Sequence, residues 1–143
     1  MSEEYIDKVL KSLDNDNNEG IMQLTNARIK GEKNNILQQL QIERQSLKML
    51  HTKLKSYRYV DEISDIHYGY YIRWIPLKNP DNIKLTNGAH VCDIKISTEG
   101  VNILCRNRYN KFMQINLDTN IIFQKLTEQE IIILKTLDYL EKK

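Results

Sequence analysis

Long apolar stretches are missing from this 143-residue chain, in which 41% of residues are hydrophobic and 28% are charged. A membrane-spanning helix needs about 18 or more consecutive apolar residues, and no stretch of the sequence approaches that length. The first five residues, MSEEY, are acidic where a secretory signal is basic and then apolar. We therefore expect no membrane contact and a location in a reducing intracellular compartment such as the cytoplasm.

Cysteine and glycine are also scarce. Cys92 and Cys105 are too few for a disulfide framework, and we expect both to be buried free thiols in neighbouring strands. His67 and His90 are the only other residues that suggest zinc, but the paired-cysteine spacing of such sites is missing, so no metal is predicted. The five scattered glycines form no phosphate-binding loop, and there is no Gly-x-Ser-x-Gly motif. We therefore predict no cofactor and no enzymatic activity.

A seven-residue apolar repeat is present in the stretch 21–58, for which we predict one long amphipathic helix. The repeat is weaker at its start, where Asn26 and Lys33 take heptad positions. The expected seam consists of the stronger positions: Ile36, Leu40, Leu47, Leu50, Leu54 and Tyr57. We expect this seam to join two or three copies of the chain. The alternatives are that the helix packs onto its own domain or onto the first helix, or that it packs onto a different structural protein.

Beyond residue 69 the apolar spacing changes to the alternation that is typical of β-strands. Five short strands are predicted, at 69–75, 90–96, 101–105, 111–117 and 121–123. A helix is predicted over 127–141, because Thr127 and Glu130 have the spacing of a capping box. The expected fold class is α+β, with an N-terminal helical or coiled-coil arm and a small five-stranded antiparallel sheet or barrel.

The predicted organisation has three parts. Residues 1–20 form a short helix and a linker, and residues 21–58 form the long helix. Residues 59–143 form the small β-domain, which the helix 127–141 covers.

Two groups of residues are candidates for nucleic-acid contact, because cations bind phosphates and exposed rings stack on bases. The first group lies in a predicted hairpin loop and comprises Arg106, Arg108, Tyr109 and Lys111. The second lies near the end of the predicted long helix and comprises Lys48 and Lys55. The stretch 59–143 has eleven basic and eleven acidic residues, so an ordinary solvated loop and helix face is the alternative.

The predicted strand 69–75 carries a third group. Alternation places Tyr71 and Arg73 on one face and Trp74 on the other. An aromatic residue beside an arginine is common at protein interfaces. Tyr71 and Arg73 are therefore candidate protein contacts, and Trp74 is a candidate core residue.

The stretch 65–77, DIHYGYYIRWIPL, is followed by LTNG at 85–88. This pattern resembles short β-domain proteins of large nucleocytoplasmic DNA viruses, which carry Gly-x-Tyr-Ile-Arg-Tyr-Ile before a glycine-containing turn. Trp74 stands where that pattern has Tyr, and the resemblance covers about residues 65–123. It implies a viral origin and a component of the virion or viral factory, and it transfers no catalytic residues.

Two functional hypotheses follow. The first is a structural or protein-interaction module that oligomerises through its heptad helix, in the virion if the resemblance holds. The alternative is a small nucleic-acid-binding β-domain that uses the hairpin loop and the basic end of the helix.

Overall fold

The computed structural model describes residues 2–141 and has the predicted α+β class. Its helices are α1 (Glu3–Asp14), α2 (Asn26–Gln38), α3 (Arg44–Lys53) and α4 (Glu128–Glu141). Its strands are β1 (Tyr57–Val60), β2 (Tyr71–Pro76), β3 (Ala89–Ser97), β4 (Gly100–Arg106), β5 (Phe112–Asn116) and β6 (Asn120–Lys125). Within residues 2–141, no helix is both long enough and apolar enough to cross a membrane.

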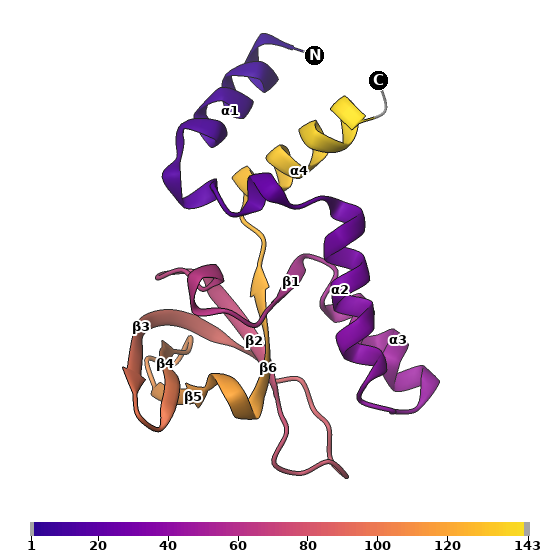
Figure 1. The fold of residues 1–143 in the computed structure, drawn as a ribbon, viewed down its shortest axis with the longest axis vertical. Helices are drawn as coiled ribbons and strands as arrows, with labels where there is room; N and C mark the ends of the chain where they lie inside the picture. Colours follow the sequence, from indigo (N-terminus) through magenta and orange to yellow (C-terminus); the bar gives the residue numbers. More distant parts are fainter. Residues whose placement is uncertain (1, 142–143) are drawn as a thin grey trace. The chain divides into compact units, whose positions relative to one another are not determined.

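The chain divides into two compact units (Figure 1). Unit 1 comprises Met1–Lys33 and Leu126–Lys143, and unit 2 comprises Asn34–Lys125. This division differs from the predicted ranges 1–20, 21–58 and 59–143. The reason is that α4 belongs with α1, while α3 belongs with the strands.

Unit 1 is helical and has its own apolar cluster, formed by Ile21, Ile29, Ile133 and Leu134. Helices α1 and α4 lie side by side (Figure 1). The capping box that opens α4 is confirmed: the Glu130 N–H donates to Thr127 Oγ1 at 3.1 Å, and the Thr127 N–H donates to Glu130 Oε1 at 2.9 Å. Asn26, expected on a seam, instead donates to the carboxylate of Asp138.

The single helix predicted over 21–58 is wrong. Helix α2 ends at Gln38 and α3 begins at Arg44, because the chain turns between them at Gln41, whose φ is 52°. After α3 the chain enters β1 at Tyr57, a strand that was not predicted, so the sheet has six strands instead of five.

All six expected seam residues lie in one cluster inside unit 2. Leu50, Leu54 and Tyr57 are buried there, and Ile36, Leu40 and Leu47 pack against them. The cluster also contains strand residues, including Ile75, Ile121 and Phe123. A helix that packs on a sheet needs the same apolar stripe as a helix that pairs with another helix. Heptad spacing alone therefore did not distinguish the two arrangements, and the structure has the intramolecular one.

The sheet of unit 2 is antiparallel, with strand order β1-β6-β2-β3-β4-β5. One face, here called the inner face, contributes buried residues from all six strands to a single cluster, and none of these buried residues belongs to an α-helix. The sheet is therefore curled, so that this face packs on itself and on Ile66 of the loop between β1 and β2. The predicted split of β2 is confirmed: Ile72 and Trp74 lie on the inner face, while Tyr71 packs on the opposite, outer face.

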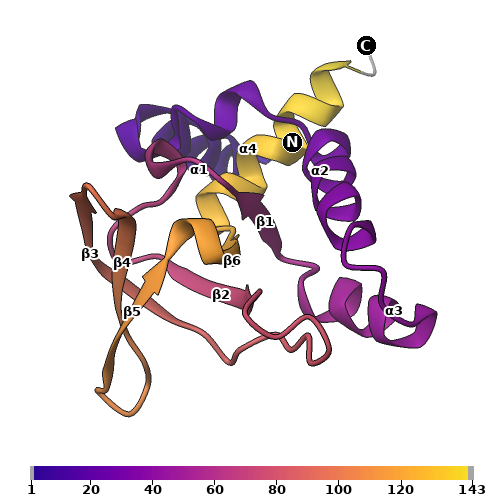
Figure 2. The same ribbon diagram turned by 60° about the horizontal axis from the view of Figure 1, so that its bottom comes forward.

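Helices cover only part of the outer face. The second half of α2 and helix α3 pack on β1, β6 and β2, which we call the covered half. The outer-face residues of β3, β4 and β5 include exposed side chains such as His90, Arg106 and Phe112, and we call this the open half. Figures 1 and 2 both show α3 on one side of unit 2 and the β4–β5 hairpin on the other.

A β-bulge in β3 corrects the prediction for Cys92. The register between β3 and β4 shifts between Val91 and Asp93, so Cys92 has no direct partner. Val91 is buried on the inner face and Cys92 is exposed, whereas Cys105 is buried as expected. A bulge inserts one residue and reverses the alternation beyond it, which regular spacing cannot reveal.

Candidate nucleic-acid interface

The β4–β5 loop is organised by one asparagine side chain. Asn107 Oδ1 accepts hydrogen bonds from the backbone N–H groups of Tyr109 (2.9 Å) and Lys111 (3.0 Å). The Asn107 N–H donates to the Lys111 carbonyl, which closes the loop at its base. Asn110 has a φ of 62°, a left-handed conformation that asparagine adopts more readily than most residues. The local sequence therefore fixes the backbone on which the basic and aromatic side chains stand.

Arg108 and Tyr109 form a pair at the tip of this loop. The Arg108 guanidinium lies over the Tyr109 ring, with its carbon 4.8 Å from the ring centroid, and it donates to the Tyr109 hydroxyl at 2.7 Å. The Tyr109 side chain is still 67% exposed. One ring face carries the cation, and the pair combines a positive charge with a solvent-accessible aromatic surface.

A row of side chains crosses four strands below the loop. Tyr71 of β2 is paired with His90 of β3, His90 with Arg106 of β4, and Arg106 with Phe112 of β5. The Tyr71 and His90 rings meet edge to face, with centroids 5.0 Å apart. Phe112 is 63% exposed, an unusual position for a phenylalanine. The row places three aromatic rings and one cation on the outer face, running from the boundary of the covered half across the open half.

Segment 86–88 lies close against β2. Thr86 exchanges hydrogen bonds with the backbone of Trp74 and accepts one from Arg73 Nε at 2.8 Å. The Tyr71 hydroxyl donates to the Asn87 carbonyl. Gly88 has a φ of 96°, and a Cβ there would lie 2.5 Å from the carbonyl oxygen of Ile72. This approach requires glycine, for both the conformation and the space.

These parts surround a hollow of about 480 Å³ between β2, segment 86–88 and the β4–β5 loop. The residues that matter for its chemistry are Arg73, Trp74, Asn87, Arg108 and Tyr109. Among the described residues that line it, two are arginines and none is a carboxylate. One site therefore contains two pairs of sequence candidates, Tyr71 with Arg73 and Arg108 with Tyr109. The two pairs are 35 or more residues apart along the chain.

Arg73 also connects the hollow to the covered half. Burial raises the pKa of the Tyr57 phenol, while Arg73, which is hydrogen-bonded to it, acts in the opposite direction. A guanidinium has five N–H donors, so Arg73 has donors left for a ligand after bonding Tyr57 and the Thr86 carbonyl. Its position is held from two sides, as expected for a positioned anion-binding group.

The two candidates from the predicted long helix, Lys48 and Lys55, are not at this site. Lys48 lies on α3 and Lys55 in the turn that follows it, both exposed. Neither lines the hollow, and α3 lies on the opposite side of unit 2 from the β4–β5 hairpin in both views (Figures 1 and 2). Arg106 and Lys111, in contrast, flank the loop tip and are exposed. The structure thus gathers the hairpin-loop group and separates it from the helix group.

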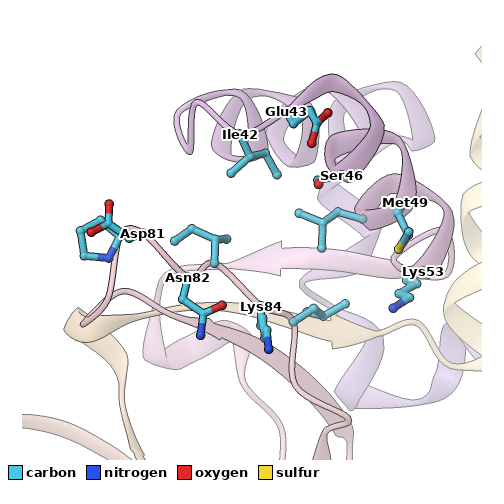
Figure 3. A pocket seen from close by; sticks show the side chains of 12 residues that line it. Ile42, Glu43, Ser46, Met49, Lys53, Asp81, Asn82 and Lys84 are labelled. Atoms are coloured by element: carbon cyan, nitrogen blue, oxygen red, sulfur yellow. The ribbon is translucent and has the colours of Figure 1, made fainter.

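A second hollow of about 490 Å³ lies between α3 and the loop 80–85 (Figure 3). Met49 and Lys53 line it from the helix, and Asp81 and Lys84 line it from the loop (Figure 3). Its lining contains two acidic and two basic side chains, the other acid being Glu43. Because these charges balance, the second hollow favours neither an anion nor a cation.

The residues weighed for a metal do not gather. Among residues 2–141, no three His, Cys, Asp or Glu side chains lie together in a way that would hold an ion. Cys92 is exposed at the bulge and Cys105 is buried on the inner face. Burial raises the pKa of the Cys105 thiol to about 12, so it remains protonated at neutral pH and is a poor metal ligand.

Sequence reasoning missed His90 and Phe112 as members of the row. A five-residue loop over 107–111 makes its flanking residues, Arg106 and Phe112, cross-strand partners. That signal was available from the sequence. The place of His90 depends on the β3–β4 register, which the bulge alters, so no local signal would have found it. A scan of family models and searches of curated proteins and of solved structures returned no match to this chain.

Proposed function

We propose that unit 2 binds single-stranded nucleic acid through a basic–aromatic surface, defined by Tyr71, Arg73, His90, Arg106, Arg108, Tyr109, Lys111 and Phe112. The observation that carries this proposal is the cross-strand row that leads to a hollow with two arginines and no lining carboxylate. Cations placed along a path of exposed rings are the means by which sheet surfaces hold unpaired strands.

Single strands are favoured over duplexes because of what the rings offer. Phe112 and Tyr109 are each more than 60% exposed and have ring faces that a base stacks on only when it is unpaired. The open half has no protruding helix that would enter a major groove. Asp93 is the carboxylate nearest in sequence to the row, and it is partly buried and accepts a hydrogen bond from the Ile94 N–H.

Self-association stays a prediction. Its expected seam now has an intramolecular role, since all six residues belong to the helix–sheet cluster. Light scattering at tens of micromolar checks it directly, and a monomer would contradict it. The virion role stays a prediction from the resemblance, and co-purification with capsid protein from the native source would test that.

The test of the proposed function is a binding series with the full chain. Fluorescence anisotropy would follow labelled 12-nucleotide oligothymidylate, oligouridylate and a 12-base-pair duplex at 25 to 300 mM salt. We expect both single strands to bind, to weaken steeply as salt increases, and to bind more tightly than the duplex. If none of the three oligonucleotides binds at 25 mM salt, the proposal is overturned.

A further inference from the structure

We infer that the hollow between β2, segment 86–88 and the β4–β5 loop holds one unstacked nucleotide, with its base against the aromatic wall and its phosphate at Arg73 and Arg108. This inference rests on the proposed function and assigns a defined subsite within the basic–aromatic surface. The volume of about 480 Å³ falls near the lower end of the range for small-ligand sites. Such a space suits a single nucleotide better than a stacked run of bases.

Charge selects the phosphate. Arg73 lines the hollow from β2, and Arg108 lines it from the β4–β5 loop. No described lining residue carries a negative charge. Guanidinium groups bind phosphate oxygens with two parallel hydrogen bonds, which lysine does not do. A cation as ligand is therefore disfavoured, and a neutral ligand would leave the arginines without an anionic partner.

Ring surface selects the base. Arg108 occupies one face of the Tyr109 ring, so the opposite face is the one left for stacking. Trp74, which is 7% exposed, also lines the hollow. The exposed carboxamide of Asn87 offers both a donor and an acceptor at the rim, the groups that meet a base edge.

The walls are already in place before a ligand arrives. Thr86 is bonded to Trp74 and Arg73, and Asn107 holds the loop backbone. Pre-organised walls reduce the ordering that binding requires. A flexible basic loop would bind phosphates equally well with or without bases, whereas a fixed hollow distinguishes the two.

The experiment uses Trp74, the one tryptophan of the chain, as its reporter. The probes are an end-labelled pentathymidylate and a matching five-unit abasic oligomer with the same phosphates, titrated at 25 mM salt. We expect the pentathymidylate to bind at least about fivefold more tightly, since base stacking contributes this much or more. We also expect the pentathymidylate, but not the abasic oligomer, to change the fluorescence emission of Trp74.

A charge variant gives an independent readout. Asn87→Asp introduces a carboxylate at the rim without changing side-chain size, and Asn79→Asp makes the same change at an exposed position outside the hollow. We expect Asn87→Asp to weaken pentathymidylate binding about tenfold and Asn79→Asp to change it less than twofold. Equal weakening by both variants would contradict the subsite.

The outcomes separate the subsite from the wider proposal. Equal affinity for the two oligomers, with Trp74 emission unchanged, would overturn the inferred nucleotide site while nucleic-acid binding remained. Absence of binding to both oligomers, together with none to the 12-nucleotide strands, would overturn the proposed function itself.

Discussion

The two halves of the outer sheet face differ in what covers them. On the covered half, Leu50 of α3 and Leu54, the residue that follows α3, pack against Ile75, Ile121 and Phe123 of the sheet. On the open half, the equivalent outer positions are held by His90, Arg106 and Phe112, which face solvent. One sheet therefore uses one part of its outer face for stability and leaves another part for binding.

The inner face explains how the open half remains ordered without a helix. Buried residues of β3, β4 and β5, such as Val91, Ile103 and Ile115, belong to the same cluster as those of β2 and β6. The strands are thus anchored from the inside, so the outer face of the open half stays ordered without a covering helix. Exposed rings and cations on an anchored strand are typical of a functional surface.

The largest difference between the halves should appear in stability. Leu54 is fully buried in the helix–sheet cluster, so Leu54→Ala is expected to lower the free energy of unfolding by about 2–5 kcal/mol. Phe112→Ala, on the open half, should change it by about 0.5 kcal/mol or less, because Phe112 is mostly exposed. Urea unfolding followed by circular dichroism measures both, and similar losses would contradict the division.

Glycine substitutions test the wall beside the hollow. Gly69 and Gly88 both have positive φ, but only at Gly88 would a Cβ collide with backbone and side-chain atoms. Gly69→Ala should cost about 1–2 kcal/mol from the left-handed conformation alone. Gly88→Ala should cost a further ~1–3 kcal/mol from overpacking against Ile72 and Tyr71. Equal melting temperatures for the two variants would show that segment 86–88 does not lie so close to β2.

The cysteines test whether the inner face is closed beneath the open half. Cys92 should react with a thiol reagent at pH 8 in the folded protein, and Cys105 only after unfolding, because it is fully buried. In a Cys92→Ser variant the folded protein should therefore show no reaction. Reaction of two thiols at equal rates in the native chain would contradict a closed inner face.

The same buried thiol also predicts a loss of stability in alkali. The pKa of Cys105 is about 12 in the folded chain against an ordinary value of 9.0. Between these values the unfolded chain has lost this proton and the folded chain retains it, so stability decreases as pH increases. Cys105→Ala should reduce the loss between pH 9 and 12, as measured by urea unfolding at several pH values. An unchanged slope in that variant would contradict this assignment.

Much of the fold followed from the sequence, where local chemistry determines local structure. The capping box at Thr127 and Glu130, the alternation in β2 and a hairpin loop after Cys105 are short-range signals, and the structure contains all three, with the loop one residue later than predicted. The broken helix and strand β1 were missed because the partner of an apolar stripe is set by tertiary packing, not by spacing.

The candidate site was only partly predictable for a related reason. Its loop residues form a group in the sequence, because basic and aromatic residues stand together there, and two of them, Arg108 and Tyr109, line the hollow. That this loop lies beside Tyr71 and Arg73 depends on the pairing of β2 with β3, which no short segment specifies. Lys48 and Lys55 were joined to the site by charge alone, and the break between α2 and α3 places them elsewhere.

The most direct test of the division between the halves compares two double variants of equal charge change. Arg106→Ala with Arg108→Ala removes two cations from the open half, and Lys48→Ala with Lys55→Ala removes two from α3 and its following turn. All four side chains are exposed, so the free energies of unfolding should stay within about 0.5 kcal/mol of the parent.

Anisotropy titrations with a 12-nucleotide single strand over a salt series give the result. We expect the double arginine variant to bind about tenfold or more weakly, with a slope of log affinity against log salt that is smaller by about 1–2. The double lysine variant should change affinity less than twofold. Equal losses for the two pairs, or a loss confined to the lysine pair, would contradict the assignment of binding to the open half.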